Sequence, residues 1–181
     1  MTIYTKKGDA GTTSTVTGEK ISKSSQLLEL QGSVDEVNAG IGYLISICCE
    51  TMIGKEIKHV VDMLRDIQYA LFRIGTDVSS NFTKALLEEN EVELLEKEID
   101  FMESKTGSLT NFIHYSGTQA STYTHVIRSV TRRAERVFAG LLKETVPHDY
   151  KYLNRLADYF FALARYLNHL EEIEDEIMKL R

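Results

Sequence analysis

Proline and tryptophan are nearly missing from this sequence. Pro147 is its single proline, and none of its 181 residues is a tryptophan. Because proline interrupts the hydrogen bonding of a helix interior, its scarcity favours long, unbroken helices. No apolar run approaches the roughly 20 residues that a membrane-spanning helix needs, and the polar N-terminus does not resemble a secretory signal. We therefore expect a helical, cytoplasmic protein with no membrane segment.

Cysteine and basic charge are also scarce. The only cysteines are the neighbours Cys48 and Cys49, which rarely form a disulfide when adjacent and lack the C-x-x-C spacing of a zinc site. Since both fall in an apolar stretch, we expect two buried thiols in a reducing compartment. The formal net charge is −6, which argues against general nucleic-acid binding, because that function normally requires a basic excess.

What the sequence does have is a helical hydrophobic period. Apolar residues recur at steps of three and four in five segments, which run from Leu27 to Cys48, Ile57 to Val78, Val92 to Met102, Ala120 to Leu141 and Leu153 to Leu170. This spacing predicts five amphipathic helices packed nearly parallel. The fold class that follows is all-α, a five-helix up-down bundle. We expect one domain over residues 1–181, with the bundle in residues 24–181.

Local signals predict where the helices begin and end. The polar run at residues 79–81 offers N-cap chemistry ahead of the third helix, and Asp149 offers it for the fifth. The acidic tail after Leu170 keeps its isoleucines and Leu180 at helical spacing with one slip. We therefore predict that the fifth helix continues through the tail.

Residues 1–23 stand outside the bundle pattern. Their stretch "TKKGDAGTTS", residues 5–14, combines glycines, hydroxyl groups and lysines. Glycines let backbone N–H groups turn toward a ligand, and hydroxyls and lysines add donors and charge, so the stretch has the requirements for wrapping a polyphosphate. It is not a Walker A sequence. On composition alone, a disordered terminus is the more common explanation.

Four arginines occur in "RSVTRRAER", residues 128–136, within an otherwise acidic protein. Arg128, Arg132 and Glu135 lie one turn apart on one helix face, and Arg136 flanks them. Arginine suits bidentate binding of phosphate oxygens. A solvated face stabilised by ion pairs between successive turns explains the same pattern equally well.

A third polar group lies in "YLNRLADYFFALAR", residues 152–165. Asn154 and Asp158 are four residues apart and share a helix face. The aromatic residues at 159–161 supply the core and also a wall for a ligand. By itself this segment is better explained as an ordinary core helix that carries solvated polar groups.

The polar groups named above do not lie on the apolar seam, which is the stripe of apolar residues along one face of each predicted helix. Asp35, Arg128 and Asn154 fall beside the seam, and Arg132 and Asp158 fall opposite it. We therefore expect them to face away from the core of the bundle. A pocket built from them needs a second wall, which the N-terminal segment, another subunit, or both must provide.

A metal centre is the weakest candidate. Glu56 and His59 form an E-x-x-H motif, which di-iron bundles use in two copies on different helices. No second copy occurs on another helix, and the remaining histidines are scattered. We therefore expect no dedicated metal site and find no pattern that indicates a Ser-His-Asp nucleophile.

Four segments in this order resemble the PduO-type ATP:cob(I)alamin adenosyltransferases over nearly the whole chain. The first, "YTKKGDAGTTS", is similar to that family's signature Y-T-[KR]-x-G-D-x-G-x-T-S and is followed by Lys23; the others are "GSVDEVNAGIG" at residues 32–42, "RRAER" at 132–136 and the 152–165 segment. The resemblance implies a five-helix bundle with an ordered N-terminal segment. It also implies a homotrimer with active sites between subunits, and a transferase that moves the 5′-deoxyadenosyl group of ATP to the cobalt of cob(I)alamin and releases triphosphate.

The resemblance further implies an ATP site in two parts. The N-terminal part wraps the triphosphate and comprises Thr5, Lys6, Lys7, Gly8, Asp9, Gly11, Thr12 and Thr13, with charge added by Lys23. The helical part comprises Arg132, Arg133, Glu135, Arg136 and Asn154. Mg²⁺ is expected to arrive with ATP, near Glu135, rather than in a dedicated protein site.

The corrinoid site implied in the same way consists of Asp35, Asn38, Phe112, Arg128 and Asp158. Asp35 and Arg128 would pair across the subunit boundary, and Phe112 would press on the lower face of the corrin ring and exclude an axial ligand. Together with Arg132, these three are the expected catalytic residues. Because cob(I)alamin is itself a strong nucleophile, no catalytic base is needed.

One departure from the family pattern follows Phe112. The family usually reads F-[IV]-L-P-G-G there, whereas this chain reads "FIHYSG". The proline is lost, and His114 is placed where it could approach the cobalt. A cobalamin reductase and an adenosylcobalamin-dependent mutase are the expected protein partners. Two alternatives stay open, namely a carrier that delivers the cofactor to a client mutase with little turnover, and a structural bundle whose arginines serve only subunit packing.

Overall fold

The computed structural model of the chain describes residues 3–52, 54–142 and 147–179. It contains five helices, which are α1 (Gln26–Thr51), α2 (Lys55–Ser79), α3 (Glu89–Thr106), α4 (Gln119–Ala139) and α5 (His148–Leu170). The predicted five-helix bundle is confirmed. None of the helices in the described part of the chain is long and apolar enough to cross a membrane.

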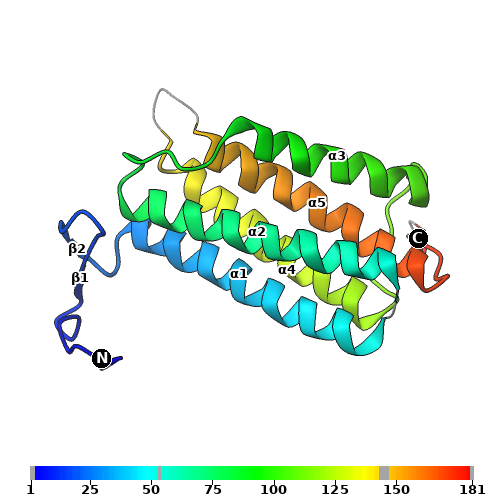
Figure 1. The fold of residues 1–181 in the computed structure, drawn as a ribbon, viewed down its shortest axis with the longest axis horizontal. Helices are drawn as coiled ribbons and strands as arrows, with labels where there is room; N and C mark the ends of the chain where they lie inside the picture. Colours follow the sequence, from blue (N-terminus) through cyan, green and yellow to red (C-terminus); the bar gives the residue numbers. More distant parts are fainter. Residues whose placement is uncertain (1–2, 53, 143–146, 180–181) are drawn as a thin grey trace.

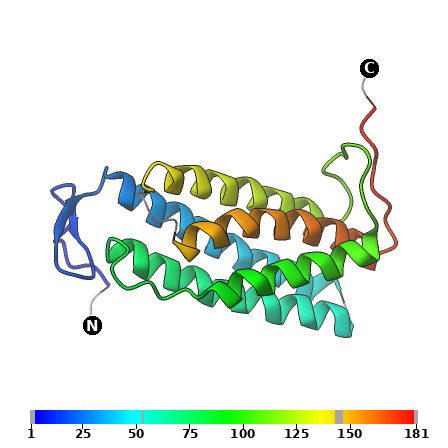
Figure 2. The ribbon, with the colours of Figure 1, turned by 90° about the horizontal axis from the view of Figure 1, so that it is seen from above.

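The helices run alternately up and down along one long axis (Figure 1). α1 packs against α2 and α4, and α5 packs against α4 and α3. The N-terminal segment stands at the end where α1 begins, whereas the loop between α3 and α4 and the C-terminal tail lie at the opposite end (Figures 1 and 2). The length of the bundle therefore separates the N-terminal segment from the α3–α4 loop and the C-terminal tail.

One apolar core runs through the bundle. Leu30, Ile41, Leu64, Leu153 and other residues of the predicted seam are fully buried in it. Burial of each such side chain contributes about 1.5–3 kcal/mol. The seam therefore determines which face of every helix points inward, and the polar face is left outside.

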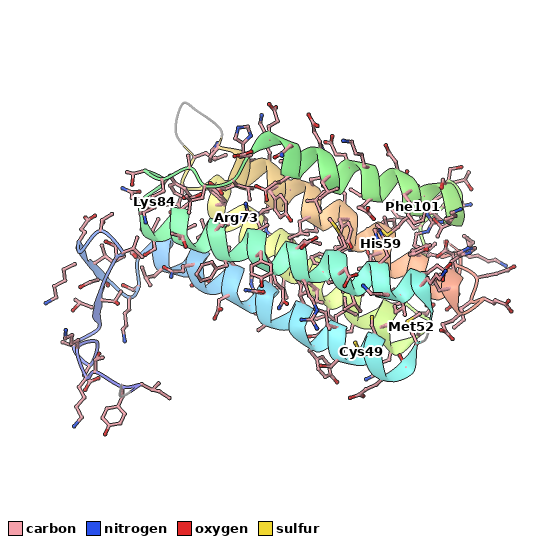
Figure 3. The ribbon with its side chains drawn as sticks, in the orientation of Figure 1. Cys49, Met52, His59, Arg73, Lys84 and Phe101 are labelled. Atoms are coloured by element: carbon pink, nitrogen blue, oxygen red, sulfur yellow. The ribbon has the colours of Figure 1, made fainter. Side chains whose placement is uncertain are left out.

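The cysteine prediction holds for only one of the two thiols. Cys48 is buried in the core, and burial raises the pKa of its thiol to about 11. Cys49 is exposed on the outer face of α1 (Figure 3). Adjacent helix positions point about 100° apart, so one apolar stripe cannot bury both.

Two predicted helix starts are wrong. The polar run at residues 79–81 closes α2, because Ser80 N donates to the carbonyl oxygens of Thr76 and Asp77. α3 begins later, with Glu88 and Glu91 forming a capping box. α5 begins directly after Pro147, so Asp149 lies inside its first turn and is buried rather than capping.

The predicted extension of the fifth helix is also wrong. α5 ends at Leu170, and Glu172 adopts a left-handed conformation with φ 56°. The tail then turns back, and Ile177 forms an antiparallel bridge with Ile113 of the α3–α4 loop. Acidic residues at a helix C-terminus oppose the helix dipole, and the backbone partners in the loop favour an extended tail. Leu180 lies outside the described residues.

A pair of buried carboxyl groups joins the end of α2 to the start of α5. Asp77 and Asp149 are 0% and 2% exposed. Asp77 Oδ2 accepts a hydrogen bond from Leu86 N at 2.6 Å, whereas the Oδ1 atoms of both aspartates are buried without a described partner. Burial, and then the neighbouring Asp77, raise the pKa of Asp149 to about 7. Glu91 adds a smaller contribution to the same shift in the pKa of Asp149.

This pair predicts that stability falls as pH rises. The pKa of Asp149 is 3.8 when unperturbed and about 7 in the fold, so the folded state binds the proton more tightly. Burial of the two carboxyl groups therefore destabilises the fold least near pH 4. As pH rises toward about 7, the free energy of unfolding falls by on the order of 2–4 kcal/mol. Asp149→Asn should flatten this dependence in urea unfolding measured at pH 5, 6.5 and 8 at fixed protein concentration. Glu50→Gln, at an exposed site, is the control and should leave the slope unchanged. Equal slopes for wild type and Asp149→Asn would contradict the raised pKa of Asp149 as the source of the pH dependence.

Candidate functional site

The N-terminal segment forms an ordered arm. Strands β1 (Thr12–Ser14) and β2 (Lys20–Ser22) pair antiparallel, with Thr13 opposite Ile21. Gly11 has φ +76°, a conformation that glycine adopts without strain, and its carbonyl accepts from Lys23 N at 2.9 Å. The ordered polar segment predicted at this terminus is thus present, and it stands off the end of the bundle (Figures 1 and 2).

Within the arm, the structure brings a lysine to a glycine turn. A Cβ atom on Gly8 would lie 2.7 Å from Lys23 Nζ, so this ammonium group rests against the backbone of residue 8. Two turn hydrogen bonds, Asp9 N to Lys6 O and Gly11 N to Gly8 O, fold the same stretch. A short turn with a lysine against it is a suitable shape for an anion.

The other predicted residues of the arm are accessible. Thr5, Lys6, Lys7 and Asp9 are exposed, while Thr12 and Thr13 are half-buried in the hairpin. The arm contacts the bundle through Val16 N, which donates to Ser79 Oγ at 3.1 Å. These positions leave the polar groups of residues 5–9 free to meet a ligand.

The arginine face of α4 points outward, as the seam predicts. Arg132 and Arg136 are exposed, and neither makes an ion pair with a residue that the structure describes. Arg133 instead pairs with Glu36 of α1, a residue that sequence reasoning did not single out. Two positive charges on this face are therefore left without a counter-charge in the described chain.

Asn154 and Glu135 are brought together between α5 and α4. Asn154 Nδ2 donates to Glu135 Oε1 at 2.7 Å, and both groups lie at the surface. Sequence spacing could not reveal this contact, because the two residues are on different helices. The bond orients the amide of Asn154 beside the arginine face.

The two predicted parts of the ATP site do not meet within one chain. No hydrogen bond or ion pair between residues 3–14 and α4 or α5 occurs in the part of the chain that the structure describes. The hairpin lies beyond the end of the bundle at which α4 ends and α5 begins (Figure 1).

Asp35 and Asn38 line a groove on the α1–α2 face. The groove has a volume of about 590 Å³ and is also lined by Val16, Phe72 and Ser79. Asn38 Oδ1 is buried without a described partner. Arg128 lies on α4, and neither it nor Asp35 forms an ion pair with any described residue. The structure therefore leaves the expected Asp35–Arg128 pair unformed inside one chain.

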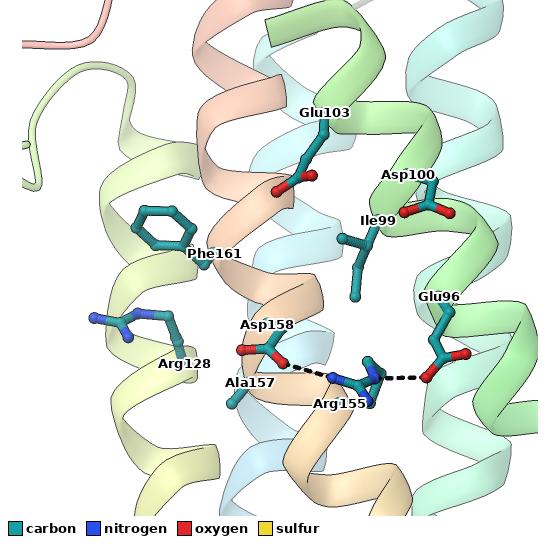
Figure 4. A pocket seen from close by; sticks show the side chains of 9 residues that line it. All are labelled: Glu96, Ile99, Asp100, Glu103, Arg128, Arg155, Ala157, Asp158 and Phe161. Atoms are coloured by element: carbon teal, nitrogen blue, oxygen red, sulfur yellow. Dashed lines mark hydrogen bonds and ion pairs between the residues drawn. The ribbon is translucent and has the colours of Figure 1, made fainter. Parts of the chain in front are cut away.

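A second pocket, of about 540 Å³, lies between α3, α4 and α5 (Figure 4). Arg155 crosses it, donating to Glu96 Oε1 at 2.9 Å and to Asp158 Oδ2 at 3.1 Å. Arg128 points toward Phe161 on the other side, with its guanidinium carbon 5.6 Å from the ring centroid. Asp158 is thus paired with Arg155, and Arg128 is held by aromatic contacts.

Phe112 projects from the α3–α4 loop with its side chain 84% exposed. Its backbone is held by the C-terminal tail, because Met178 N donates to Phe112 O and His114 N donates to Glu176 O, both at 2.8 Å. The tail is itself fixed by an ion pair at 2.8 Å between the buried Arg165 and Asp175. An apolar side chain is thereby presented to solvent on a restrained backbone. The approach of the exposed His114 to cobalt stays a prediction.

The far side of the same loop is clamped by Asn168 of α5. Its Nδ2 donates to Ser116 O at 2.9 Å, and its Oδ1 accepts from Thr118 N at 3.0 Å. Gly117 lies between them with φ +107°, and a Cβ atom there would lie only 2.2 Å from Asn168 Oδ1. Glycine is required at this position both by the backbone conformation and by the close approach.

The E-x-x-H motif does not form part of a larger ligand cluster. His59 Nε2 lies 2.9 Å from Glu98 Oε2 of α3, on the outside of the bundle near Phe101 (Figure 3). Among the described residues, no group of three or more histidines, cysteines or carboxylates is placed to hold a metal ion.

Comparisons with known proteins identify the family of this chain. The profile of the cobalamin adenosyltransferase family matches residues 3–167. The corrinoid adenosyltransferase MMAB of Mus musculus is 37% identical over 98% of this chain and 77% of its own length. The corrinoid adenosyltransferase of Bacillus subtilis is 36% identical over 97% of this chain and 91% of its own length. The chain belongs to the cobalamin adenosyltransferase family.

Solved structures resemble the chain over its full length. A variant PduO-type ATP:corrinoid adenosyltransferase from Lactobacillus reuteri, complexed with cobalamin and ATP, has a TM-score of 0.87 at 33% identity and covers 99% of this chain and 100% of that one. Another variant of the same enzyme, complexed with ATP, has a TM-score of 0.86 at 34% identity over 98% and 100%.

Proposed function

We propose that this chain is an ATP:corrinoid adenosyltransferase, which transfers the 5′-deoxyadenosyl group of ATP to the cobalt of cob(I)alamin and produces adenosylcobalamin and triphosphate. The observation that carries the proposal is the outward arginine face of α4, whose exposed cations Arg132 and Arg136 have no counter-charge among the described residues. The full-length likeness to an enzyme complexed with cobalamin and ATP supports it.

The chemistry requires charge stabilisation more than proton transfer. Cobalt attacks the 5′ carbon of ATP with its own electron pair, the C5′–O bond breaks, and triphosphate leaves with the bonding electrons. Cationic side chains and Mg²⁺ aimed at the leaving group stabilise its growing negative charge. Holding both substrates in line supplies a further share of the rate.

We assign the triphosphate to the arm and to α4. Residues 5–13 and Lys23 wrap it, because the turn at Gly8 already has the Lys23 ammonium against it. Arg132, Arg133 and Arg136 bind from the helix side. Asn154 contacts the nucleotide, and Glu135, which accepts a hydrogen bond from it at 2.7 Å, lies near the Mg²⁺ that accompanies ATP.

A second copy of the chain provides the missing wall. Tyr69 and Phe72 are each 71% exposed on α2, and Phe72 lines the groove that contains Asp35 and Asn38, whose Oδ1 is buried without a described partner. An exposed aromatic patch beside an unpaired carboxylate is typical of a surface that a subunit covers. The assembly is a homotrimer in which Asp35 of one protomer faces Arg128 of the next, with the corrinoid beside them.

Phe112 is assigned to the lower face of the corrin ring, with Asn38 and Asp158 as further contacts to the corrinoid. Its exposed ring and restrained backbone fit an apolar wedge that excludes an axial ligand, which makes the cobalt easier to reduce. Because cob(I)alamin is strongly reducing, a cobalamin reductase and a reducing compartment such as the cytoplasm suit the reaction, and an adenosylcobalamin-dependent mutase takes the product.

An anaerobic assay with cob(I)alamin and Mg-ATP tests the proposal. The expected result is the absorption spectrum of adenosylcobalamin together with one triphosphate for each corrinoid converted. Tight binding of both substrates without product would instead favour a carrier. Absence of nucleotide binding would favour a purely structural bundle.

Arg132→Ala should lower kcat on the order of 10²–10³-fold, because one donor to the leaving group is lost. The urea midpoint should stay at the wild-type value, since the side chain is exposed. Lys97→Ala, which removes an exposed cation of α3, is the matched control and should keep wild-type kcat. A kcat within threefold of wild type in Arg132→Ala would refute the assigned role.

A further inference from the structure

Tyr115, three residues after Phe112, connects the loop to α4. Its ring stacks on His125 with centroids 4.3 Å apart and an interplanar angle of 26°. The guanidinium carbon of Arg128 lies over the same ring, 5.1 Å from its centroid, and Arg128 Nη2 donates to the Tyr115 hydroxyl at 2.7 Å. One side chain of the loop thus makes three contacts with two neighbouring turns of α4.

The partner of the stack is a neutral imidazole. His125 is 4% exposed, and burial, assisted by the charge of Arg128, lowers its pKa to about 4. His125 also lies 5.9 Å from Phe161, which in turn lies under the Arg128 guanidinium. Tyr115 therefore completes a cluster in which aromatic rings hold one cation in place.

The loop lacks the proline that its resemblance to the family leads one to expect. A proline would fix the backbone locally. In this chain the tail holds Phe112 and His114, and Asn168 holds residues 116 and 118. Tyr115 lies between these two anchors, and its side chain is what joins the middle of the loop to the helix.

We propose that Tyr115 is a positioning residue for the corrinoid half of the site. Its ring takes over the role of the missing proline and keeps Phe112 in place, and its hydroxyl orients the Arg128 guanidinium toward Asp35 of a neighbouring protomer. This assignment rests on the proposed function. Arg128 Nε is buried without a described partner, so the hydroxyl is the acceptor that fixes the orientation of the fork.

The two roles predict different effects for two variants. Tyr115→Ala removes the ring and frees the loop, whereas Tyr115→Phe keeps the stack and removes only the hydrogen bond to Arg128. Electron paramagnetic resonance of cob(II)alamin with Mg-ATP measures the fraction of four-coordinate cobalt, which depends on the placement of Phe112. Phe112→Ala provides the reference for complete loss of that placement.

For Tyr115→Ala we expect at least a tenfold lower four-coordinate fraction, close to that of Phe112→Ala. For Tyr115→Phe we expect a four-coordinate fraction within twofold of wild type, because the ring is retained. Its KM for the corrinoid should rise about tenfold with nearly unchanged kcat, because a hydrogen bond to a charged group is lost. The Kd for Mg-ATP should stay within twofold in both variants, which shows that the fold is retained.

The outcomes separate this proposal from the one on which it rests. A wild-type signal in Tyr115→Ala overturns the positioning role, and loss of the signal in Tyr115→Phe as complete as in Tyr115→Ala overturns the role of the ring. An unchanged corrinoid KM in Tyr115→Phe overturns the role of the hydroxyl. If the wild-type protein itself forms neither four-coordinate cobalt nor adenosylcobalamin, the proposed function fails before the variants are compared.

Discussion

Burial of the apolar seam determines where the chemistry of this protein can take place. Because residues such as Val34 and Ile127 occupy the inner faces of their helices, the neighbouring Asp35 is exposed and the neighbouring Arg128 is half-buried at the edge of the core. The core that the structure describes is mainly apolar, and burial of a triphosphate among such side chains is strongly unfavourable. We therefore propose that a charged ligand binds on the outer surface of the bundle, against a second wall outside the five helices.

The arm and the α3–α4 loop, at the two ends of the bundle, also present their groups on the outer surface. The arm presents a lysine against a glycine turn, and the α3–α4 loop presents Phe112 on a backbone restrained by the tail and by Asn168. Hydrogen bonds within the chain restrain both segments, and such restraint lowers the conformational entropy that binding costs. The two segments lie at opposite ends of the bundle (Figures 1 and 2), so they do not form one site within a single chain, and a site shared between protomers is the arrangement that we propose.

The sequence predicts the helices well because apolar residues at steps of three and four fall on one face of a helix, and burial of that face produces a bundle. It also predicts that Arg132 and Asn154 face outward. The same spacing misleads in the tail, where Ile177 pairs with the loop instead of extending α5. Contacts between distant segments, such as Tyr115 on His125 or Asp77 beside Asp149, leave no periodic signal. The roles of single residues in ATP and corrinoid binding came from the family resemblance, and spacing alone could not supply them.

Complementation between two inactive variants tests the shared site most directly. Asp35→Ala chains keep Arg132, and Arg132→Ala chains keep Asp35, so a mixed assembly contains intact sites only if the two residues are contributed by neighbouring protomers. After unfolding and refolding together in equal amounts, the account predicts recovery of about a quarter of wild-type turnover, the share expected for random neighbours in a closed ring. Each variant refolded alone should stay inactive. Failure of the mixture to exceed the separate variants, with mixed assemblies present, would contradict the account.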